Sequence, residues 1–232
     1  MRSSTWHALG NTYRVVEPEG ARLYAARAVA LAAGTDGVLE VLGTTASSVD
    51  IIIWNPDGSS AELSGNGTRI AGAWLAERTG ATRVTVNVGS RAIETTLSET
   101  GDIQQLIGDV VVGPAETVDG ITFVPVCVGN PHAVVIGDPS TIGVIGPELE
   151  TNARFPDRTN VQVARVDGEG EVTARVWERG VGETLSSGTS AVAVAAATHG
   201  EGEVVVHFPG GDLRVHLADG RATLHGTAER VD

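Results

Sequence analysis

Hydrophobic and polar positions alternate over much of the chain, as they do in strands that bury one face. Several of the alternating runs are separated by glycine turns, such as Asp167–Gly170. The sequence predicts strands at 12–17, 37–42, 49–54, 83–88, 91–97 and 104–112 in the first half, and at 121–128, 132–137, 160–166, 171–177, 203–208, 212–217 and 221–225 in the second.

Helices are expected where the alternation stops. Ala, Leu and Arg dominate 21–33, a weaker helical stretch leads toward 154, and small residues fill 65–78 and 188–198. A helix with little bulk on any face is normally buried among close neighbours. We therefore expect strands to wrap around the helices at 65–78 and 188–198.

The chain repeats itself. Trp177–Ala197 aligns without gaps on Trp54–Trp74, and the flanking segments recur in the same order. We interpret this as a duplication with domains at 1–112 and 113–225, and residues 226–232 form a last strand that could return to the first domain. The correspondences are Trp54 with Trp177, Ser64 with Ser187, Asn11 with Asn130, and Thr35-Asp36 with Thr159-Asn160.

Composition narrows the function. The formal charge of -13 argues against nucleic acid or an anionic membrane as a partner. No apolar run is long enough to span a membrane, and the N-terminus has no apolar leader, so a cytoplasmic protein is expected. The single cysteine, Cys127, excludes an internal disulfide and a thiol-rich zinc site, and no metal is expected. All 16 basic residues are arginine, so no lysine can hold pyridoxal phosphate, and we expect no cofactor.

The start of each small-residue helix carries the candidate chemistry. Ser64–Gly67 and Ser187–Ser190 begin helices whose first backbone N–H groups lack intrahelical partners, and such ends bind carboxylate or phosphate. A small acid held by both would have one serine on each side, which suits a two-sided reaction at one carbon. The alternative is structural: serine is a common N-cap, and the nearby Asn, Glu, Arg and His side chains could serve turns and loops.

Six motifs follow one another along the whole chain. The most specific are Gly129-Asn130-Pro131-His132 and the run from Glu178 to Thr184, and the other four lie at 7–11, 34–37, 55–59 and 155–161. In this order they resemble the diaminopimelate epimerase family, which contains cofactor-independent amino-acid epimerases.

The resemblance implies an α/β (α+β) fold of two pseudo-symmetric domains. Each is a curled, barrel-like sheet around a central helix, and the site lies between the domains. It implies inversion of LL-diaminopimelate to the meso form in lysine and cell-wall synthesis, and a homodimer is possible. The substrate-binding residues that it implies are Asn11, Asn55, Gly65, Asn66, Asn130, Asn160, Glu178, Arg179, Gly188 and Thr189.

The sequence departs from the family at the two catalytic positions. The family has cysteine as base and acid, whereas this chain has Ser64 and Ser187, with His132 and Glu178 in the places of the thiols' partners. A serine hydroxyl is a far weaker acid than a thiol, so we expect impaired proton transfer. Three interpretations stay open: an epimerase with both cysteines replaced, a natural homologue that uses serine or acts on another amino acid, and a non-catalytic amino-acid-binding protein.

Overall fold

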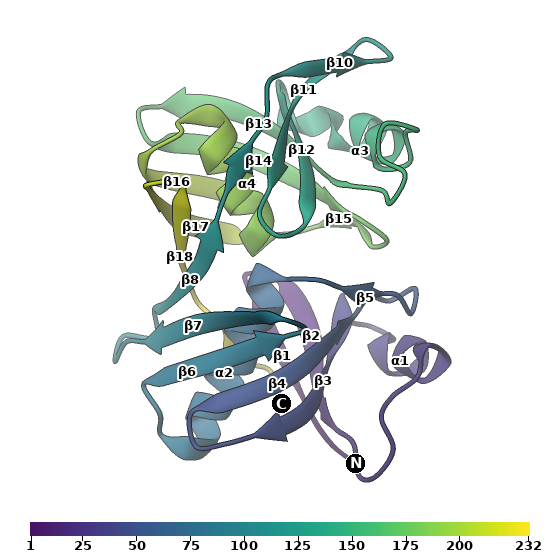
Figure 1. The fold of residues 1–232 in the computed structure, drawn as a ribbon, viewed down its shortest axis with the longest axis vertical. Coiled ribbons are helices and arrows are strands. Elements are labelled where there is room, and N and C mark those ends of the chain that lie inside the picture. Colours follow the sequence, from purple (N-terminus) through teal and green to yellow (C-terminus); the bar gives the residue numbers. More distant parts are fainter. The chain divides into compact units, whose positions relative to one another are not determined.

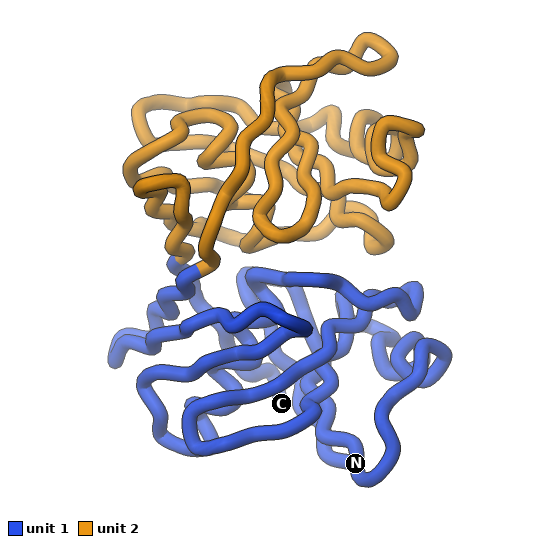
Figure 2. The backbone as a smooth tube through the Cα atoms, in the orientation of Figure 1, with its two compact units in different colours: residues 1–106, 225–232 blue, residues 107–224 orange.

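The computed structural model describes all residues, 1–232, and divides them into two compact units. Unit 1 comprises Met1–Leu106 with His225–Asp232, and unit 2 comprises Ile107–Leu224 (Figure 2). None of the helices is long and apolar enough to cross a membrane.

Unit 1 consists of a mixed sheet and two helices, α1 (Ala25–Ala32) and α2 (Gly65–Thr79). In order across the sheet, β19, β1 and β2 pair antiparallel, β3 joins β2 in parallel, and β4 pairs antiparallel with β3. β6 then joins β4 in parallel and continues antiparallel into β7 and β8. The strands are β1 (Arg2–Ala8), β2 (Asn11–Glu17), β3 (Gly37–Thr44), β4 (Ser48–Trp54), β5 (Ser60–Ala61), β6 (Arg83–Val88), β7 (Arg91–Leu97), β8 (Ile103–Asp109) and β19 (Glu229–Arg230).

Unit 2 repeats this order around its own helices, α3 (Ile142–Glu150) and α4 (Gly188–Thr198). β11 and β12 pair antiparallel, β13 joins β12 in parallel, β14 pairs antiparallel with β13, and β16 joins β14 in parallel. The strands are β9 (Val111–Val112), β10 (Glu116–Val118), β11 (Ile121–Cys127), β12 (Pro131–Ile136), β13 (Asn160–Gly168), β14 (Glu171–Glu178), β15 (Gly182–Thr184), β16 (Gly202–Phe208), β17 (Gly211–Ala218) and β18 (Arg221–Gly226), and the short 3₁₀ helix η1 spans Pro139–Thr141.

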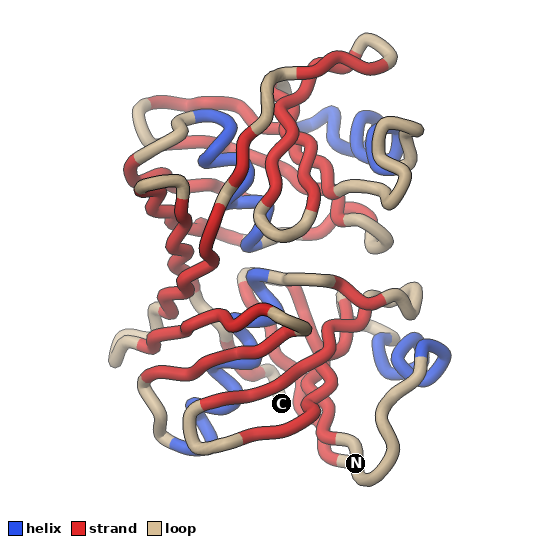
Figure 3. Tube along the Cα trace, in the orientation of Figure 1, coloured by secondary structure: helices blue, strands red, loops and turns tan.

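The expected central helices are present in both units (Figures 1 and 3). Every residue of 65–75 in α2 and of 188–196 in α4 is buried. Small residues allow this packing: a Cβ added at Gly72 would lie 2.8 Å from the Thr95 methyl group of β7. The predicted fold class, two pseudo-symmetric α/β domains with a curled sheet around a helix, is therefore confirmed.

Several elements differ from their predictions, such as the strand predicted at 104–112, which is divided into β8 and β9, and two of them do so for local reasons. The sequence does not predict β1, because its inward positions are Ser4, Trp6 and Ala8, which give no run of large apolar residues. α1 begins at Ala25 instead of residue 21, because Tyr24 has an extended backbone (φ −123°, ψ 160°), and the Leu23 N–H before it donates to the Glu40 carboxylate (2.7 Å).

The strand register corrects one correspondence between the repeats. Tyr13 lies opposite Gly37, and His132, which is Tyr13's equivalent, lies opposite Asn160. Asn160 therefore corresponds to Gly37 and not to Asp36, so the sequence-based pairing of Thr35-Asp36 with Thr159-Asn160 is wrong by one residue.

Candidate active site

Ser64 is the N-cap of α2, with extended backbone (φ −135°, ψ 120°). Its Oγ accepts the Gly67 N–H over 3.0 Å, which satisfies one donor of the first turn. The same oxygen lies 3.2 Å from the Tyr13 hydroxyl, and both side chains are buried. Ser64 thus caps α2 and also lies among the candidate site residues.

Tyr13 reaches Ser64 because its ring packs over Gly37. A Cβ on Gly37 would lie 2.7 Å from the ring and 2.6 Å from the Trp54 carbonyl oxygen. In unit 2 the equivalent ring is the smaller imidazole of His132, and there the position of Gly37 is taken by Asn160. The size of the ring explains why one repeat needs glycine where the other carries a polar side chain.

A buried polar chain leads from Arg69 to Asn11. The Arg69 guanidinium donates to Asn66 Oδ1 (2.6 Å), and Asn66 Nδ2 donates to Asn11 Oδ1 (3.2 Å). Burial lowers the pKa of Arg69 to about 10, so the group is still a cation at neutral pH. No carboxylate forms an ion pair with it, and its Nε donates to the Thr227 carbonyl over 2.9 Å. A buried positive charge therefore lies within the first two turns of α2.

Asn11 and Asp36 lie beside this chain. Asp36 Oδ2 accepts the Thr12 N–H (2.7 Å), and burial raises the pKa of the carboxyl group although this hydrogen bond and the Asn11 amide oppose the rise. Asn11 Nδ2 is buried and meets no acceptor with hydrogen-bond geometry. Asn11 thus accepts from Asn66 with its oxygen, and its N–H₂ group lies near the Asp36 carboxylate.

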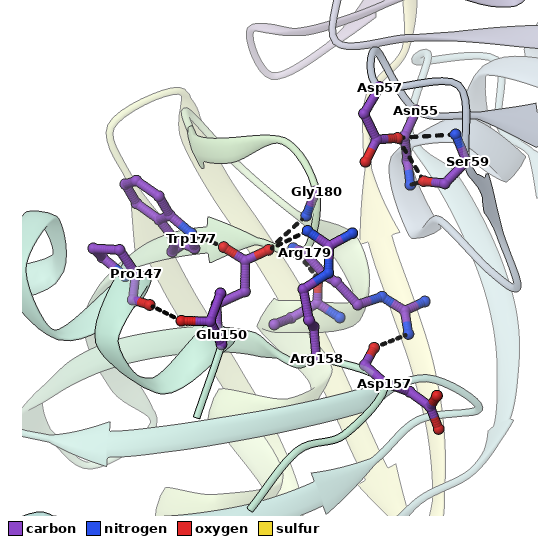
Figure 4. A network of polar contacts seen from close by, with 12 residues as sticks. Asn55, Asp57, Ser59, Pro147, Glu150, Asp157, Arg158, Trp177, Arg179 and Gly180 are labelled. Atoms are coloured by element: carbon purple, nitrogen blue, oxygen red, sulfur yellow. Dashed lines mark hydrogen bonds and ion pairs between the residues drawn. The ribbon is translucent and has the colours of Figure 1, made fainter. Parts of the chain in front are cut away.

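Asn55 follows β4 and turns the chain. Its Nδ2 donates to Ser59 Oγ (3.0 Å), and its backbone N–H donates to the Ser59 carbonyl (2.8 Å). The Asp57 carboxylate accepts both the Ser59 N–H and the Ser59 hydroxyl (Figure 4). This turn corresponds to the one after β14 that carries Glu178 and Arg179.

Ser187 stands at the start of α4 with the same extended backbone as Ser64 (φ −150°, ψ 126°), but its side chain caps nothing. Beside it, Asn130 Nδ2 is 3.4 Å from the Thr189 hydroxyl, and Asn130 Oδ1 is 2.9 Å from His132 Nε2. The two repeats therefore use equivalent asparagines in opposite orientations: Asn11 accepts from its helix, whereas Asn130 donates to its helix.

His132 is fully buried and has partners at both ring nitrogens. Gln162 Nε2 lies 3.0 Å from Nδ1, so Nδ1 accepts and Nε2–H donates to Asn130. Burial lowers the pKa of His132 to about 3; the Gln162 hydrogen bond opposes this shift and the charge of Arg179 adds to it. His132 is therefore neutral at physiological pH, and both of its nitrogens are engaged.

Asn160 connects two strands to the turn after β14. Its Nδ2 donates to the Pro131 carbonyl (2.9 Å), and its Oδ1 accepts the backbone N–H of Arg179 (3.0 Å). Both ends of the amide thus have partners within unit 2. The Arg179 guanidinium in turn lies 3.3 Å from the Asp157 carbonyl, and Glu178 accepts the Thr184 hydroxyl (2.7 Å).

One carboxylate close to these residues is absent from the sequence-based set. Glu150, at the end of α3, accepts the Trp177 indole N–H (2.6 Å) and the Gly180 backbone N–H (2.8 Å), and it pairs with Arg158 (3.3 Å). Figure 4 shows it between the indole and the turn. The recurring tryptophan was the available signal, since Trp54 also donates its indole N–H to a buried carboxylate, that of Glu40 (2.9 Å).

Within unit 1 the structure brings Asn11, Ser64, Gly65 and Asn66 together at the start of α2. Within unit 2 it gathers Asn130, His132, Ser187, Gly188 and Thr189 at the start of α4, and Asn160, Glu178 and Arg179 at the end of β14. No three His, Cys, Asp or Glu side chains lie together as ligands for a metal ion.

A fold made of two such units, with a helix enclosed in each, recurs in solved structures. A hydroxyproline epimerase from Agrobacterium vitis superposes with a TM-score of 0.77 at 16% identity, covering 99% of this chain and 90% of that chain. A phenazine biosynthesis protein of the PhzF family from Bacillus anthracis superposes with a TM-score of 0.73 at 13% identity, covering 100% of this chain and 98% of that chain. At these identities the likeness concerns the fold.

Sequence relatives specify the family. The diaminopimelate epimerase family model matches residues 124–231. A diaminopimelate epimerase from Desulfitobacterium hafniense is 34% identical over 97% of this chain and 94% of the relative. Diaminopimelate epimerase 2 from a Nostoc strain is 32% identical over 94% of this chain and 89% of the relative. The chain belongs to the diaminopimelate epimerase family and is by family an amino-acid epimerase that needs no cofactor.

Proposed function

We propose that this protein binds diaminopimelate and interconverts its LL and meso forms by two-base transfer of the α-proton, at a rate limited by serine in both base positions. The observation that carries the proposal is the recurrence, in both units, of a buried helix start with a serine at the N-cap and an asparagine against the first turn. The names of the relatives supply the substrate.

The binding groups follow from their chemistry. We assign the substrate carboxylate to the backbone N–H groups of Gly65, Asn66, Gly188 and Thr189, because helix starts favour anions. Arg69 adds a buried positive charge near one of these starts. Asn11 contributes an N–H₂ donor, while Asn55, Asn130, Asn160, Glu178 and Arg179 complete the polar set.

The rate of the proposed reaction is limited by the weakness of serine as a base. A base must exist partly in its deprotonated form near the working pH, and a serine hydroxyl does so only with strong help. Ser64 Oγ accepts the Gly67 N–H and lies against the Tyr13 hydroxyl, and neither is a base at neutral pH. His132 is held neutral by bonds at both nitrogens. We therefore expect slow exchange of the α-proton.

A second candidate function is amino-acid binding without turnover. It is favoured because His132 is neutral and hydrogen-bonded at both ring nitrogens. A pKa of about 3 leaves it a hydrogen-bonding element of the pocket and not a proton acceptor. Binding needs only the donors and acceptors described above, and these do not include either serine hydroxyl.

Exchange of the α-proton in heavy water tests both functions. Mass and chiral analysis of LL- and meso-diaminopimelate should show slow exchange with the chain as it is, and an increase of orders of magnitude for Ser64→Cys with Ser187→Cys. Binding with no exchange in either form would support the non-catalytic function. Rapid exchange by the chain as it is, unchanged by the two cysteines, would contradict the assignment of the serines as bases.

A further inference from the structure

Glu150 makes three polar contacts, and two of them meet at one turn. Its Oε2 accepts the Trp177 indole N–H over 2.6 Å, and its Oε1 accepts the Gly180 backbone N–H over 2.8 Å. These two donors belong to the residues immediately before Glu178 and immediately after Arg179. The carboxylate thus holds both ends of the segment that carries two proposed substrate ligands (Figure 4).

The backbone of this turn has further restraints, since β14 and β15 pair across it with Glu178 opposite Gly182. The Arg179 N–H donates to Asn160 Oδ1 (3.0 Å), and the Val181 N–H returns to the Glu178 carbonyl (3.0 Å). Asn160 and Glu150 therefore receive two successive backbone N–H groups, at 179 and 180. Of the two, Glu150 is the charged one and is 7% exposed, so its hydrogen bonds are charge-assisted and shielded from water.

Glu150 also restrains the loop before β13. Arg158, whose Nη1 lies 3.3 Å from Glu150 Oε1, has φ of 60°, an uncommon conformation for a residue with a side chain. Its backbone N–H donates to the Phe155 carbonyl (2.8 Å). This loop contains Asp157, whose carbonyl oxygen lies 3.3 Å from the Arg179 guanidinium. One carboxylate thus joins the two segments that place Arg179.

Unit 1 provides an independent argument that the arrangement matters. Trp54, the equivalent of Trp177, also donates its indole N–H to a buried glutamate, but this glutamate is Glu40 of β3. The position in unit 2 that corresponds to Glu40 is Val163, which lies in the core. The two repeats therefore satisfy the same indole with carboxylates from different elements. Both repeats thus provide a carboxylate acceptor for the indole N–H, although the residue that supplies it differs.

We propose that Glu150 is a positioning residue for substrate binding: it fixes the Glu178–Arg179 turn through the Trp177 indole and the Gly180 N–H. The proposal rests on the function proposed above. It predicts that loss of the carboxylate weakens the affinity for diaminopimelate by tenfold or more, through a turn that is less ordered.

The donor and acceptor roles in these contacts provide a specific test. Both carboxylate oxygens face donors, so Glu150→Gln places an NH₂ group against a donor in either amide orientation. Trp177→Phe removes the indole donor, so the NH₂ group can then point to that side without facing a donor. Glu150→Gln should therefore weaken binding, measured by titration calorimetry with LL-diaminopimelate, and Glu150→Gln with Trp177→Phe should bind more tightly than Glu150→Gln alone.

Two control variants separate positioning from general destabilisation. Glu116→Gln makes the same chemical change in unit 2 at an exposed pair with Arg154 and should bind as the parent does. Val172→Ala removes core volume at the far end of β14 and should lower the melting temperature without a matching loss of affinity. If Val172→Ala weakens binding as much as Glu150→Gln at an equal loss of stability, Glu150 is structural only and the proposal is overturned.

A second measurement does not depend on the ligand. Hydrogen exchange of the Gly180 amide, followed by NMR, should accelerate at least tenfold in Glu150→Gln and stay unchanged in Glu116→Gln. Faster exchange with no binding of diaminopimelate by the parent would uphold the restraint and reject the proposed function. Unchanged exchange, or unchanged affinity in Glu150→Gln, would overturn the positioning role itself.

Discussion

Tyr13 places its hydroxyl oxygen 3.2 Å from Ser64 Oγ, which is the oxygen that caps α2. The ring can do so because Gly37 offers no side chain beneath it. The candidate base and the packing of the sheet are thus coupled through one glycine.

Gly37→Ala should lower the free energy of unfolding by about 1–3 kcal/mol, because the added methyl group overlaps both the Tyr13 ring and the Trp54 carbonyl. Urea unfolding measures the change. Gly143→Ala is the matched control: it lies in α3 with open space around its Cβ, and we expect it to raise stability by about 0.4–1 kcal/mol. Equal stabilities of Gly37→Ala and the parent would show that the ring does not pack there.

The two helix starts should differ when cysteines are introduced. The thiol of Ser64→Cys would receive the Gly67 N–H that the serine oxygen now accepts, whereas Ser187 receives no such bond. The thiol of Ser64→Cys should therefore have the lower pKa. Alkylation rates against pH, measured for Ser64→Cys and Ser187→Cys with Cys127→Ser in both, give the two values. The reverse order would mean that the N-cap hydrogen bond does not set thiol acidity here.

Ligand binding should be visible without turnover. Diaminopimelate at one hundred times its dissociation constant adds about 2.7 kcal/mol of stability, which should raise the melting temperature by several degrees. Arg179→Ala should abolish the shift, because a guanidinium is the best available partner for a carboxylate. Arg154→Ala, at an exposed pair, should preserve it. A shift with proline and none with diaminopimelate would reject the substrate.

His132 should make the protein less stable in weak acid. The unfolded histidine takes up a proton near pH 6.5, but the folded one does so only near pH 3, so the unfolded state binds more protons between these values. Stability should therefore fall by about 1.4 kcal/mol for each pH unit below 6.5. Denaturation at pH 6.5 and pH 5 measures this, and His132→Gln should show a smaller loss. An identical loss in both would place the proton uptake elsewhere.

His207 should have the opposite effect to His132 on the pH dependence of stability. Hydrogen bonds that His207 donates to Asp212 and Glu171 raise its pKa, while partial burial opposes the rise. Its stabilising contribution is complete below the ordinary pKa and is lost as the pH rises through the raised one. The parent should thus lose stability above pH 6.5 by an amount that His207→Gln does not show. A difference that disappears in high salt would be consistent with this exposed cluster, whereas no difference at low salt would contradict it.

The elements that the sequence predicts well are those in which one physical signal dominates. The strands at 83–88 and 91–97 have the predicted bounds because they alternate around a single buried face. The two central helices were recognisable because each contains a run of small residues, as at 71–73 and 195–197. β1 was missed because two of its three inward positions carry small side chains. Without large apolar residues at alternate positions, the sequence shows no strand pattern there.

The site was predictable as a set of residue types but not as a network. Helix starts and strand ends indicated Asn11, Ser64 and Asn130, yet nothing in the sequence fixed the orientation of an amide. The opposite use of Asn11 and Asn130 depends on Arg69 and His132, which lie on other turns and strands. Glu150 was missed for a similar reason, since it meets Trp177 across 27 residues of chain that show no periodic relation.

The burial of residues 65–75 in α2 and 188–196 in α4 has a consequence for how this protein can vary. An amphipathic helix has an outer face on which substitutions accumulate without effect, but residues 65–75 and 188–196 have no such face. In a saturation library selected for folded protein, these two segments should stand out as uninterrupted blocks of depletion, without the three-to-four-residue rhythm that marks other helices. Fluorophores, tags and affinity-maturing changes therefore belong outside these two segments, since residues 65–75 and 188–196 offer no position that is open to them.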